Sequence, residues 1–326
     1  MDKPPSMPDA ARQWPPSAAA EVLRRRARLL TRLRRFLDEA GFLEVETPVL
    51  SRGGSPELHL DSLQVPRAFP DGAPGWLITS PEFHLKRLLA AGIGDVYGIA
   101  RVFRAAETGR LHNPEFTLVE WYRRGADLAR LMDDIEALLS ALLPEKLLRA
   151  PAERVTYREA FRRHAGVDPF AASLDELRAA ASARDEDDRD ALLDRIAGFR
   201  VYPRLGEGRL TLIHDFPASQ ASLARVRPGS PPVAERVEAI VAGVELVNGF
   251  AELADAAEQK RRFEADLAAR RRAGRACPAP DERFLAALES GLPDCAGAAL
   301  GFDRLAMLAF GAASLEAVVA FPQDRA

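Results

Sequence analysis

Residues 101–117 read RVFRAAETGRLHNPEFT, and this stretch carries more chemical information than any other part of the chain. Strand-like segments, 96–103 and 115–122, flank a polar loop around Gly109, so the pattern predicts a long-looped antiparallel hairpin. A nucleotide needs what this hairpin offers: a guanidinium for a phosphate, a flat ring for the base, and an acid or amide for the adenine edge. Taken alone, the stretch also fits an ordinary surface hairpin with salt bridges.

A second segment of the same kind lies near the end of the chain. Residues 297–304 read GAALGFDR, a strand of small residues that runs into a helix carrying Arg304. Small residues allow a ligand to approach the backbone closely, and an arginine directly after them is suited to a phosphate. The agreement of two separated segments favours nucleotide binding over a surface hairpin.

The surrounding pattern alternates helices and strands. An amphipathic helix is predicted over 18–40, ending at Gly41, and a strand over 42–46, ending at Thr47-Pro48. The sequence TSPE at 79–82 follows a short strand, 76–78, and opens a helix through Leu89, with Ser80 as N-cap, Pro81 at the first helical position and Glu82 at the N-terminus. Further predicted elements are strand 210–214, a hairpin of 237–241 and 244–247, and helices 258–272 and 281–289. Residues 127–200 are predicted helical without chemistry, and the charge run 184–190 is predicted to be a solvated face or loop.

Composition excludes several classes of protein. The chain has 326 residues and a net charge of -3, which argues against binding nucleic acid mainly by phosphate neutralisation. The two cysteines, Cys277 and Cys295, have no metal-ligand spacing, and a reducing, cytoplasmic setting is expected. Residues 1–17 are expected to be a disordered leader without an apolar targeting core, and no stretch approaches membrane-spanning length. The arginines between Arg24 and Arg35 are interpreted as a solvated helix face, with an acidic macromolecular partner as the alternative.

Three segments together resemble the motifs of the class II aminoacyl-tRNA synthetases. They are residues 42–48, 104–116 and 297–304, and they occur in the order of that family. The resemblance implies an α+β fold, a class II catalytic domain with an antiparallel sheet flanked by helices, covering 18–326 with a helical insertion at about 127–200. It also implies a homodimer formed through the first motif.

Within that class the chain looks most like lysyl-tRNA synthetases, through TSPE at 79–82, HNPEFT at 112–117 and ELVNGFAEL at 245–253. By this resemblance the catalytic residues are Arg104, Arg304 and Glu245. The resemblance implies ATP as co-substrate, bound by Arg104, Glu107, His112, Asn113, Phe116, Glu245 and Arg304. It implies Mg²⁺ bound by Glu238 and Glu245.

The same resemblance implies an amino-acid pocket made by Ser80, Glu82, Glu120, Tyr122, Asn248, Glu252 and Ala299. The chemistry of the residues agrees, because a lysine-like substrate carries two ammonium groups and needs several carboxylates. The implied reaction is attack of a substrate carboxylate on the α-phosphate of ATP, which needs no side-chain nucleophile. Positioning, magnesium and arginine charge would carry the catalysis.

The short segment before the first motif helix bears on the expected acceptor. Fewer than 20 residues precede that helix, which is too few for the OB-fold that reads the anticodon in lysyl-tRNA synthetases. Anticodon-dependent tRNA binding is therefore not expected. Segments 212–220 and 295–304 resemble the bacterial ligases that attach a lysyl group to elongation factor P. That resemblance implies (R)-β-lysine or lysine as donor and a protein lysine ε-amine as acceptor.

Ala299 stands where lysyl-tRNA synthetases have glycine, which predicts an altered pocket, although an alanine that merely packs is the alternative. Two other functions remain open at this point. One is a minimal lysyl-tRNA synthetase that charges tRNA without anticodon recognition, and the other is a non-catalytic paralogue that senses lysine or ATP.

Overall fold

The computed structural model describes residues 14–183 and 188–326. Residues 1–13 of the predicted leader, 1–17, therefore lie outside the described residues. Residues 184–187 of the charge run, 184–190, also lie outside them. Among the described residues, none of the helices combines the length and the apolar character that crossing a bilayer requires.

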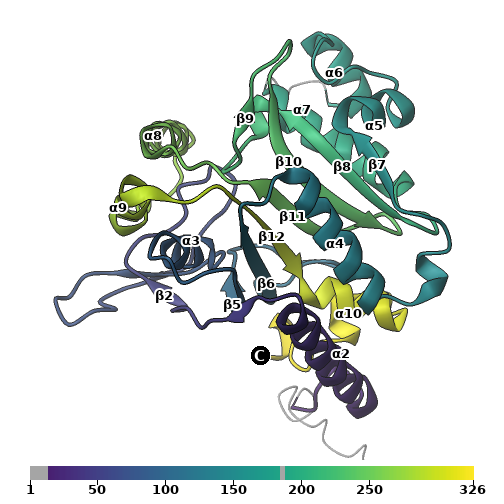
Figure 1. Ribbon diagram of the computed structural model, residues 1–326, viewed down its shortest axis with the longest axis horizontal. Helices are drawn as coiled ribbons and strands as arrows, with labels where there is room; N and C mark the ends of the chain where they lie inside the picture. The colour runs from purple at the N-terminus through teal and green to yellow at the C-terminus, as the bar shows by residue number, and fades with distance from the viewer. Residues whose placement is uncertain (1–13, 184–187) are drawn as a thin grey trace, which may run out of the picture.

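A nine-stranded sheet forms the centre of the described structure (Figure 1). Its order is β1 (Leu43–Glu44), β5 (Val96–Phe103), β6 (Glu115–Arg124), β12 (Cys295–Gly301), β11 (Val244–Ala251), β10 (Val233–Val241), β8 (Leu210–Pro217) and β7 (Glu153–Thr156), with β9 (Val226–Arg227) paired to β10. The strands from β5 to β8 pair antiparallel, and the two outer pairs, β1 with β5 and β7 with β8, are parallel. The predicted α+β class and the antiparallel interior of the sheet are confirmed.

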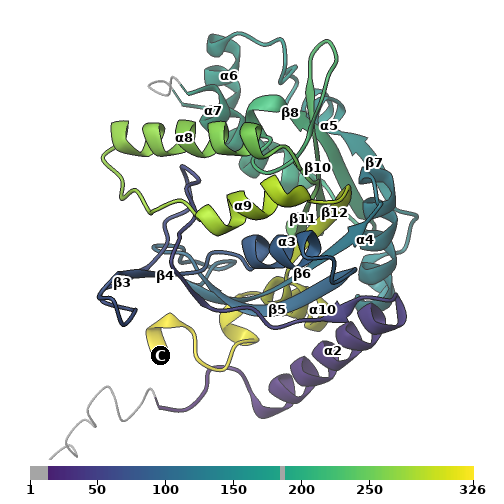
Figure 2. The same cartoon turned by 60° about the vertical axis from the view of Figure 1, so that its left-hand side comes forward.

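Helices cover both faces of this sheet. One face packs against α2 (Ala20–Glu39), α4 (Leu128–Leu142) and α10 (Phe302–Phe310) through one continuous apolar cluster. The other face packs against α3 (Glu82–Ala90), α8 (Ala256–Arg272), α9 (Glu282–Gly291), α5 (Tyr157–His164), α6 (Leu174–Ala181) and α7 (Arg189–Ile196). Figure 2 shows α3, α9 and α8 stacked above β5 and β6, with α2 on the opposite side.

The register of the central strands decides where the site forms. Glu120 of β6 lies opposite Ala299 of β12, Ala299 lies opposite Asn248 of β11, and Asn248 lies opposite Glu238 of β10. Directly opposed residues of antiparallel strands project to the same face. One row across four strands therefore places these side chains on the face of the sheet that carries α3.

The first predicted helix shows how local sequence produces its element. In α2 the buried residues are Leu29, Leu33 and Leu37, spaced by one helical turn, and Gly41 follows the helix with a φ of 86°. Most arginines of this helix face solvent, as interpreted, and pair with nearby acids such as Glu21. Arg26 instead turns inward and contacts Asp303 of α10.

Some element boundaries differ from the prediction. The strand predicted over 42–46 is reduced to β1, because only two of its residues pair with β5. The helix α3 begins at Glu82 rather than at Pro81, while the Ser80 hydroxyl accepts a hydrogen bond from the Glu82 amide at 3.0 Å. A second, three-stranded sheet consists of β2 (Leu50–Ser51), β4 (Gly75–Leu77) and β3 (Gln64–Val65).

The prediction that 127–200 is only helical is wrong at residues 153–156. These residues form β7, which extends the sheet beside β8, and the apolar face of α4 covers β10, β11 and β12. Short 3₁₀ or π turns occur at Glu145–Leu147, Ala197–Val201, Tyr202–Arg204, Ala218–Gln220, Leu315–Ala317 and Gln323–Arg325. This segment is thus part of the main framework.

Candidate active site

Two adjoining pockets lie over the central strands. The first, here called the acidic pocket, contains every residue predicted to bind the amino acid: Ser80, Glu82, Glu120, Tyr122, Asn248, Glu252 and Ala299. The second, here called the arginine pocket, contains every residue predicted to bind ATP: Arg104, Glu107, His112, Asn113, Phe116, Glu245 and Arg304. Arg104, Leu118, Asn248 and Ala299 line both pockets, so they form a shared wall.

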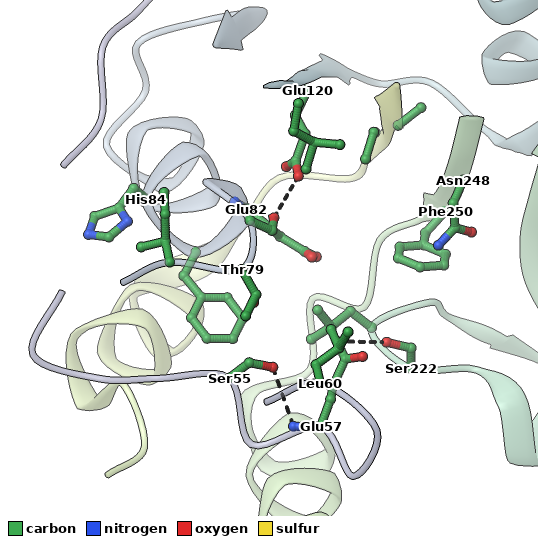
Figure 3. Close-up of a pocket in the computed structure, with 18 of the residues that line it drawn as sticks. Ser55, Glu57, Leu60, Thr79, Glu82, His84, Glu120, Ser222, Asn248 and Phe250 are labelled. Atoms are coloured by element: carbon green, nitrogen blue, oxygen red, sulfur yellow. Dashed lines mark hydrogen bonds between the residues drawn. The ribbon is translucent and has the colours of Figure 1, made fainter. Parts of the chain in front are cut away.

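Glu120 lies at the centre of the acidic pocket and is 1 % exposed. The Ser80 hydroxyl donates to one of its oxygens at 2.6 Å, and the Tyr122 hydroxyl donates to the other at 3.1 Å. Burial raises the pKa of Glu120, and the neighbouring Glu82 raises it further. Figure 3 shows Glu120 in the pocket close to Glu82. The ammonium group of a ligand placed here would stabilise the ionised form of the Glu120 carboxyl.

A buried ion-pair network forms one wall of the acidic pocket. The Lys86 ammonium lies 2.5 Å from a Glu82 oxygen and 2.5 Å from a Glu252 oxygen. Burial alone would lower the pKa of Lys86, but the two facing carboxylates more than offset this and raise it. Burial raises the pKa of Glu252, whose Oε1 has no hydrogen-bond partner in the structure.

Sequence reasoning missed the wall residues Glu57 and Ser222, and it missed Lys86, which contacts the wall residues Glu82 and Glu252. Lys86 follows Glu82 by one helical turn, and that spacing is the signal that could have found it. Glu57 and Ser222 reach the pocket from separate loops, and no local pattern marks them. Burial, with Glu82 nearby, raises the pKa of Glu57 to about 6.

Arg304 organises the arginine pocket. Its guanidinium donates to the carbonyl oxygens of Leu111 at 3.2 Å and Glu245 at 3.1 Å, and it lies 2.8 Å from His112 Nε2. Burial and the charge of Arg304 lower the pKa of His112, so its imidazole is neutral and accepts this hydrogen bond. The helix-borne arginine thereby links β11 to the hairpin loop.

Arg104 stands at the junction of the two pockets. Its guanidinium lies 5.1 Å from the centroid of the Phe116 ring, within the range of a cation–π contact. It lies 3.7 Å from Glu107, and its Nε is buried without a hydrogen-bond partner. The Arg104 guanidinium is therefore positioned by Phe116 and Glu107 and keeps hydrogen-bond donors that can bind a ligand.

Asn113 is engaged within the chain. Its amide group donates to the Glu115 carbonyl at 2.6 Å, and its side-chain oxygen accepts from the Gln323 amide at 3.0 Å. It lines the arginine pocket while joining the hairpin loop to the last turn of the chain.

The structure does not bring Glu238 to the wall of either pocket, although it lies in the same row as Asn248. Arg236 donates to Glu238 at 2.5 Å and to the Asn248 side chain at 3.1 Å, so it lies between them. Glu238 Oε2 is buried without a partner, and Glu245 is close enough to raise the pKa of Glu238, after burial itself. Within residues 14–183 and 188–326, no three His, Cys, Asp or Glu side chains gather into a metal-holding cluster.

The carboxylates of Glu245 and Glu238 nevertheless fit an Mg²⁺ ion that is bound together with a nucleotide. That ion is held by one or two carboxylates and completes its coordination with phosphate oxygens and water. Glu245, which lines the arginine pocket, and the unpartnered oxygen of Glu238 are carboxylate donors of this type.

The site combines a strongly acidic pocket with an arginine-lined pocket across one shared wall. Such a site can hold a cationic amino acid and a nucleoside triphosphate so that their reacting groups meet at Arg104. The dominant catalytic contributions available to it are positioning and charge stabilisation.

Comparisons with known proteins agree with this arrangement. Residues 13–325 match the family described as tRNA synthetases class II (D, K and N). A protein of Salmonella paratyphi A (strain ATCC 9150 / SARB42), named elongation factor P–(R)-β-lysine ligase, is 47 % identical over 325 residues, covering 96 % of this chain and 98 % of that protein. The protein of the same name from Klebsiella pneumoniae (strain 342) is 46 % identical over the same shares of both chains. This chain therefore belongs to the class II tRNA synthetase family, in which it groups with the proteins named elongation factor P–(R)-β-lysine ligase.

Proposed function

We propose that this chain uses ATP to convert (R)-β-lysine, or lysine, into an aminoacyl-adenylate and transfers the acyl group to a lysine ε-amine of elongation factor P. The observation that carries the proposal is the wall shared by the acidic and arginine pockets, with Arg104 in it. The names of the similar proteins supply the donor and the acceptor.

The acidic pocket suits a substrate with two ammonium groups. Glu82, Glu120 and Glu252 supply carboxylates, and Lys86 offsets part of their charge. An ammonium that enters stabilises the ionised form of buried carboxyls, which releases their protons. Tyr122 and Asn248 add neutral hydrogen-bonding groups.

The arginine pocket suits ATP. Phe116 offers a ring for the adenine, while Arg304 and the neutral His112 offer donors to the phosphates. When bound, Mg²⁺ would neutralise phosphate charge, with Glu238 and Glu245 as the residues that hold it. The roles of these residues are part of the proposal.

In the first step, a carboxylate oxygen of the amino acid forms a bond to the α-phosphorus of ATP, and the bond to the bridging oxygen breaks, releasing pyrophosphate. Arg104 lies where the two substrates meet, so it stabilises the charge that develops on the α-phosphate. In the second step, the unprotonated acceptor amine bonds to the acyl carbon, the bond from that carbon to the AMP oxygen breaks, and the nitrogen releases a proton as the amide forms.

The test of the donor step is ATP–pyrophosphate exchange with (R)-β-lysine, lysine or no amino acid. Arg104→Gln is expected to lower exchange by about 100- to 1000-fold, as for loss of a donor to a transition-state oxyanion. The matched control is Arg101→Gln, an exposed arginine three residues earlier on the same hairpin, which should retain exchange. Exchange that does not depend on either lysine isomer would contradict the proposal.

To test the acceptor, the chain is incubated with ATP, the amino acid, elongation factor P and lysine tRNA in one mixture, and the masses of the protein and of the tRNA are then measured. We expect a lysyl-sized gain on the protein, with faster transfer from (R)-β-lysine. Acylated tRNA without modified protein would instead identify a minimal tRNA synthetase. Binding of lysine and ATP without adenylate formation would identify a non-catalytic paralogue.

The proposal includes a homodimer and a cytoplasmic place of action. Leu43, which belongs to the segment 42–48 that resembles the dimer-forming first motif, is 52 % exposed, and Val49, directly after that segment, is 36 % exposed. The acceptor is a translation factor, which supports the cytoplasmic assignment. Sedimentation of the purified chain tests the dimer, and Leu43→Asp should shift it toward monomer.

A further inference from the structure

Glu57 is an additional acid in the wall of the acidic pocket. It comes from the loop between β2 and β3, and its Oε1 accepts a hydrogen bond from the Ser222 hydroxyl at 3.3 Å. In the view of Figure 3, Glu82 lies between Glu120 on one side and Glu57 on the other. The pocket therefore presents carboxylates from opposite directions.

Hydrogen bonds from Arg270 of α8 fix the loop that carries Glu57. The guanidinium of Arg270 in α8, which is 1 % exposed, donates to the carbonyl oxygens of Glu57 at 2.7 Å and Leu60 at 3.0 Å. It also donates to the Asp61 carboxylate at 2.7 Å, and the Asp61 carbonyl accepts from the Ala105 amide at 2.8 Å. A buried arginine with this many backbone partners fixes the position of the loop. Glu57 is thus presented by an ordered segment that is tied to the motif containing Arg104.

The positive charge of Arg104 acts on Glu57 only from beyond ion-pair distance. Among the described residues, Glu57 forms no ion pair, whereas Glu82 and Glu252 share Lys86. Its hydroxyl partner, Ser222, carries no charge. A partly buried carboxylate without a cation is stabilised by any ammonium that enters the pocket.

The position of Glu57 indicates which ammonium it meets. The carbonyl of Asp61, four residues after Glu57, accepts a hydrogen bond from the amide of Ala105 at 2.8 Å, so the loop of Glu57 adjoins Arg104, whose charge also lowers the pKa of Glu57. Arg104 marks the end of the pocket where the carboxylate is activated, because it also lines the arginine pocket. Glu57 therefore lies toward the reacting end.

We propose that Glu57 binds, together with Glu82, the ammonium nearest the carboxylate that is activated, and so acts as a specificity-determining residue for a diamino acid. This inference rests on the proposed function. The distal ammonium is left to Glu120, which lies on the other side of Glu82 in Figure 3, and to Glu252, which also lines the pocket.

The experiment compares two substrates that differ by one amine. (R)-β-Lysine has both ammonium groups, and 6-aminohexanoic acid has the same carbon chain, carboxylate and distal ammonium but lacks the other. ATP–pyrophosphate exchange of the full chain is measured with each. For Glu57→Gln we expect kcat/KM to fall about 10- to 100-fold with (R)-β-lysine, the loss typical of a charge-assisted hydrogen bond, and less than about twofold with 6-aminohexanoic acid.

Matched variants separate recognition from structure. Glu57→Asp, which keeps the charge, should recover part of the lost kcat/KM, and Glu207→Gln, an exposed acid outside both pockets, should behave as wild type. An equal fall with both substrates, or no fall with (R)-β-lysine, would overturn the assignment of Glu57. If the wild-type chain itself gives no exchange with either lysine isomer, the proposed function fails and this inference fails with it.

Discussion

Lys86 offers the sharpest test of how the acidic pocket is built. Its side chain is 1 % exposed and its ammonium lies 2.5 Å from both Glu82 and Glu252, whose side chains are 13 % and 1 % exposed. Lys86→Met keeps an unbranched side chain, one heavy atom shorter, and removes the ammonium with its charge and its hydrogen-bond donors. Two carboxylates are then left in a buried site without a cation, and such a loss costs about 3–5 kcal/mol of unfolding free energy.

The size of the thermal effect follows from the chain length. A chain of 326 residues has an unfolding entropy of about 0.7 kcal/mol per kelvin, so the midpoint should fall by about 4–7 °C. Burial raises the pKa of Glu252 to about 8 and the charge of Lys86 lowers it, so removing that charge raises this pKa further and the folded state binds the proton more tightly. The destabilisation caused by the substitution should therefore be greater at pH 9 than at pH 7, since it develops as the pH rises above the wild-type folded pKa of Glu252.

The assay is thermal and urea unfolding of the wild type and the variant at both pH values. Lys260→Met, an exposed lysine on α8, serves as the control and should change stability by less than about 0.5 kcal/mol. Adding Glu252→Gln to Lys86→Met should recover part of the loss, because one uncompensated charge disappears. A loss below about 1 kcal/mol at pH 9, or an equal loss at pH 7, would refute the assigned role of the buried network.

Other predictions concern the floor of the acidic pocket and its ionisation. Gly297→Ala would place a methyl group 2.2 Å from a ring carbon of Tyr122. We therefore expect a loss of about 1–3 kcal/mol in unfolding free energy and a raised KM for the amino acid. The control Gly198→Ala, whose added methyl group would meet no atom within 4 Å, should stay within about 1 kcal/mol of wild type by thermal unfolding. Ala299→Gly enlarges the wall shared by the pockets, and it should lower the ratio of kcat/KM for (R)-β-lysine over lysine; an unchanged ratio would mean that this methyl only packs. Burial raises the pKa of Glu120 to about 8, so kcat/KM for a diamino acid should rise from pH 6 to pH 8 as the carboxyl loses its proton, and Glu120→Gln should flatten that profile.

Local patterns were sufficient for most of the elements in the structure. The hairpin of β5 and β6, the turn near Gly243 and the helix ending before Gly41 each depend on residues close in sequence. Alternation, helical spacing and a glycine at positive φ act over a few residues, so they can be read without the fold. The short strand β7 has too few residues to give such a signal, and its state depends on the edge of β8 that it joins.

The candidate site divides in the same way. The residues of the three motifs could be named from the sequence, and the structure gathers those predicted to bind ATP in one pocket and those predicted to bind the amino acid in another. Their catalytic and binding roles stay predictions until the variants are measured. Glu238 was grouped with Glu245 from the family resemblance alone. Its partner Arg236 lies two positions earlier on the same face of β10, but the strand predicted from the sequence began at residue 237, so the pairing was missed.

By itself, the sequence determined the class of the fold, the order of its elements and the chemical types of side chain available to a site. Only the tertiary structure decided that Lys86 lies between Glu82 and Glu252, and that Arg270 holds the loop that brings Glu57 to the same pocket. The physical reason is that helix and strand periodicity act between near neighbours. The contacts of Glu57 and Arg270 join segments more than 160 residues apart, and they exist only once the sheet register and the helices packed on it have set the distances.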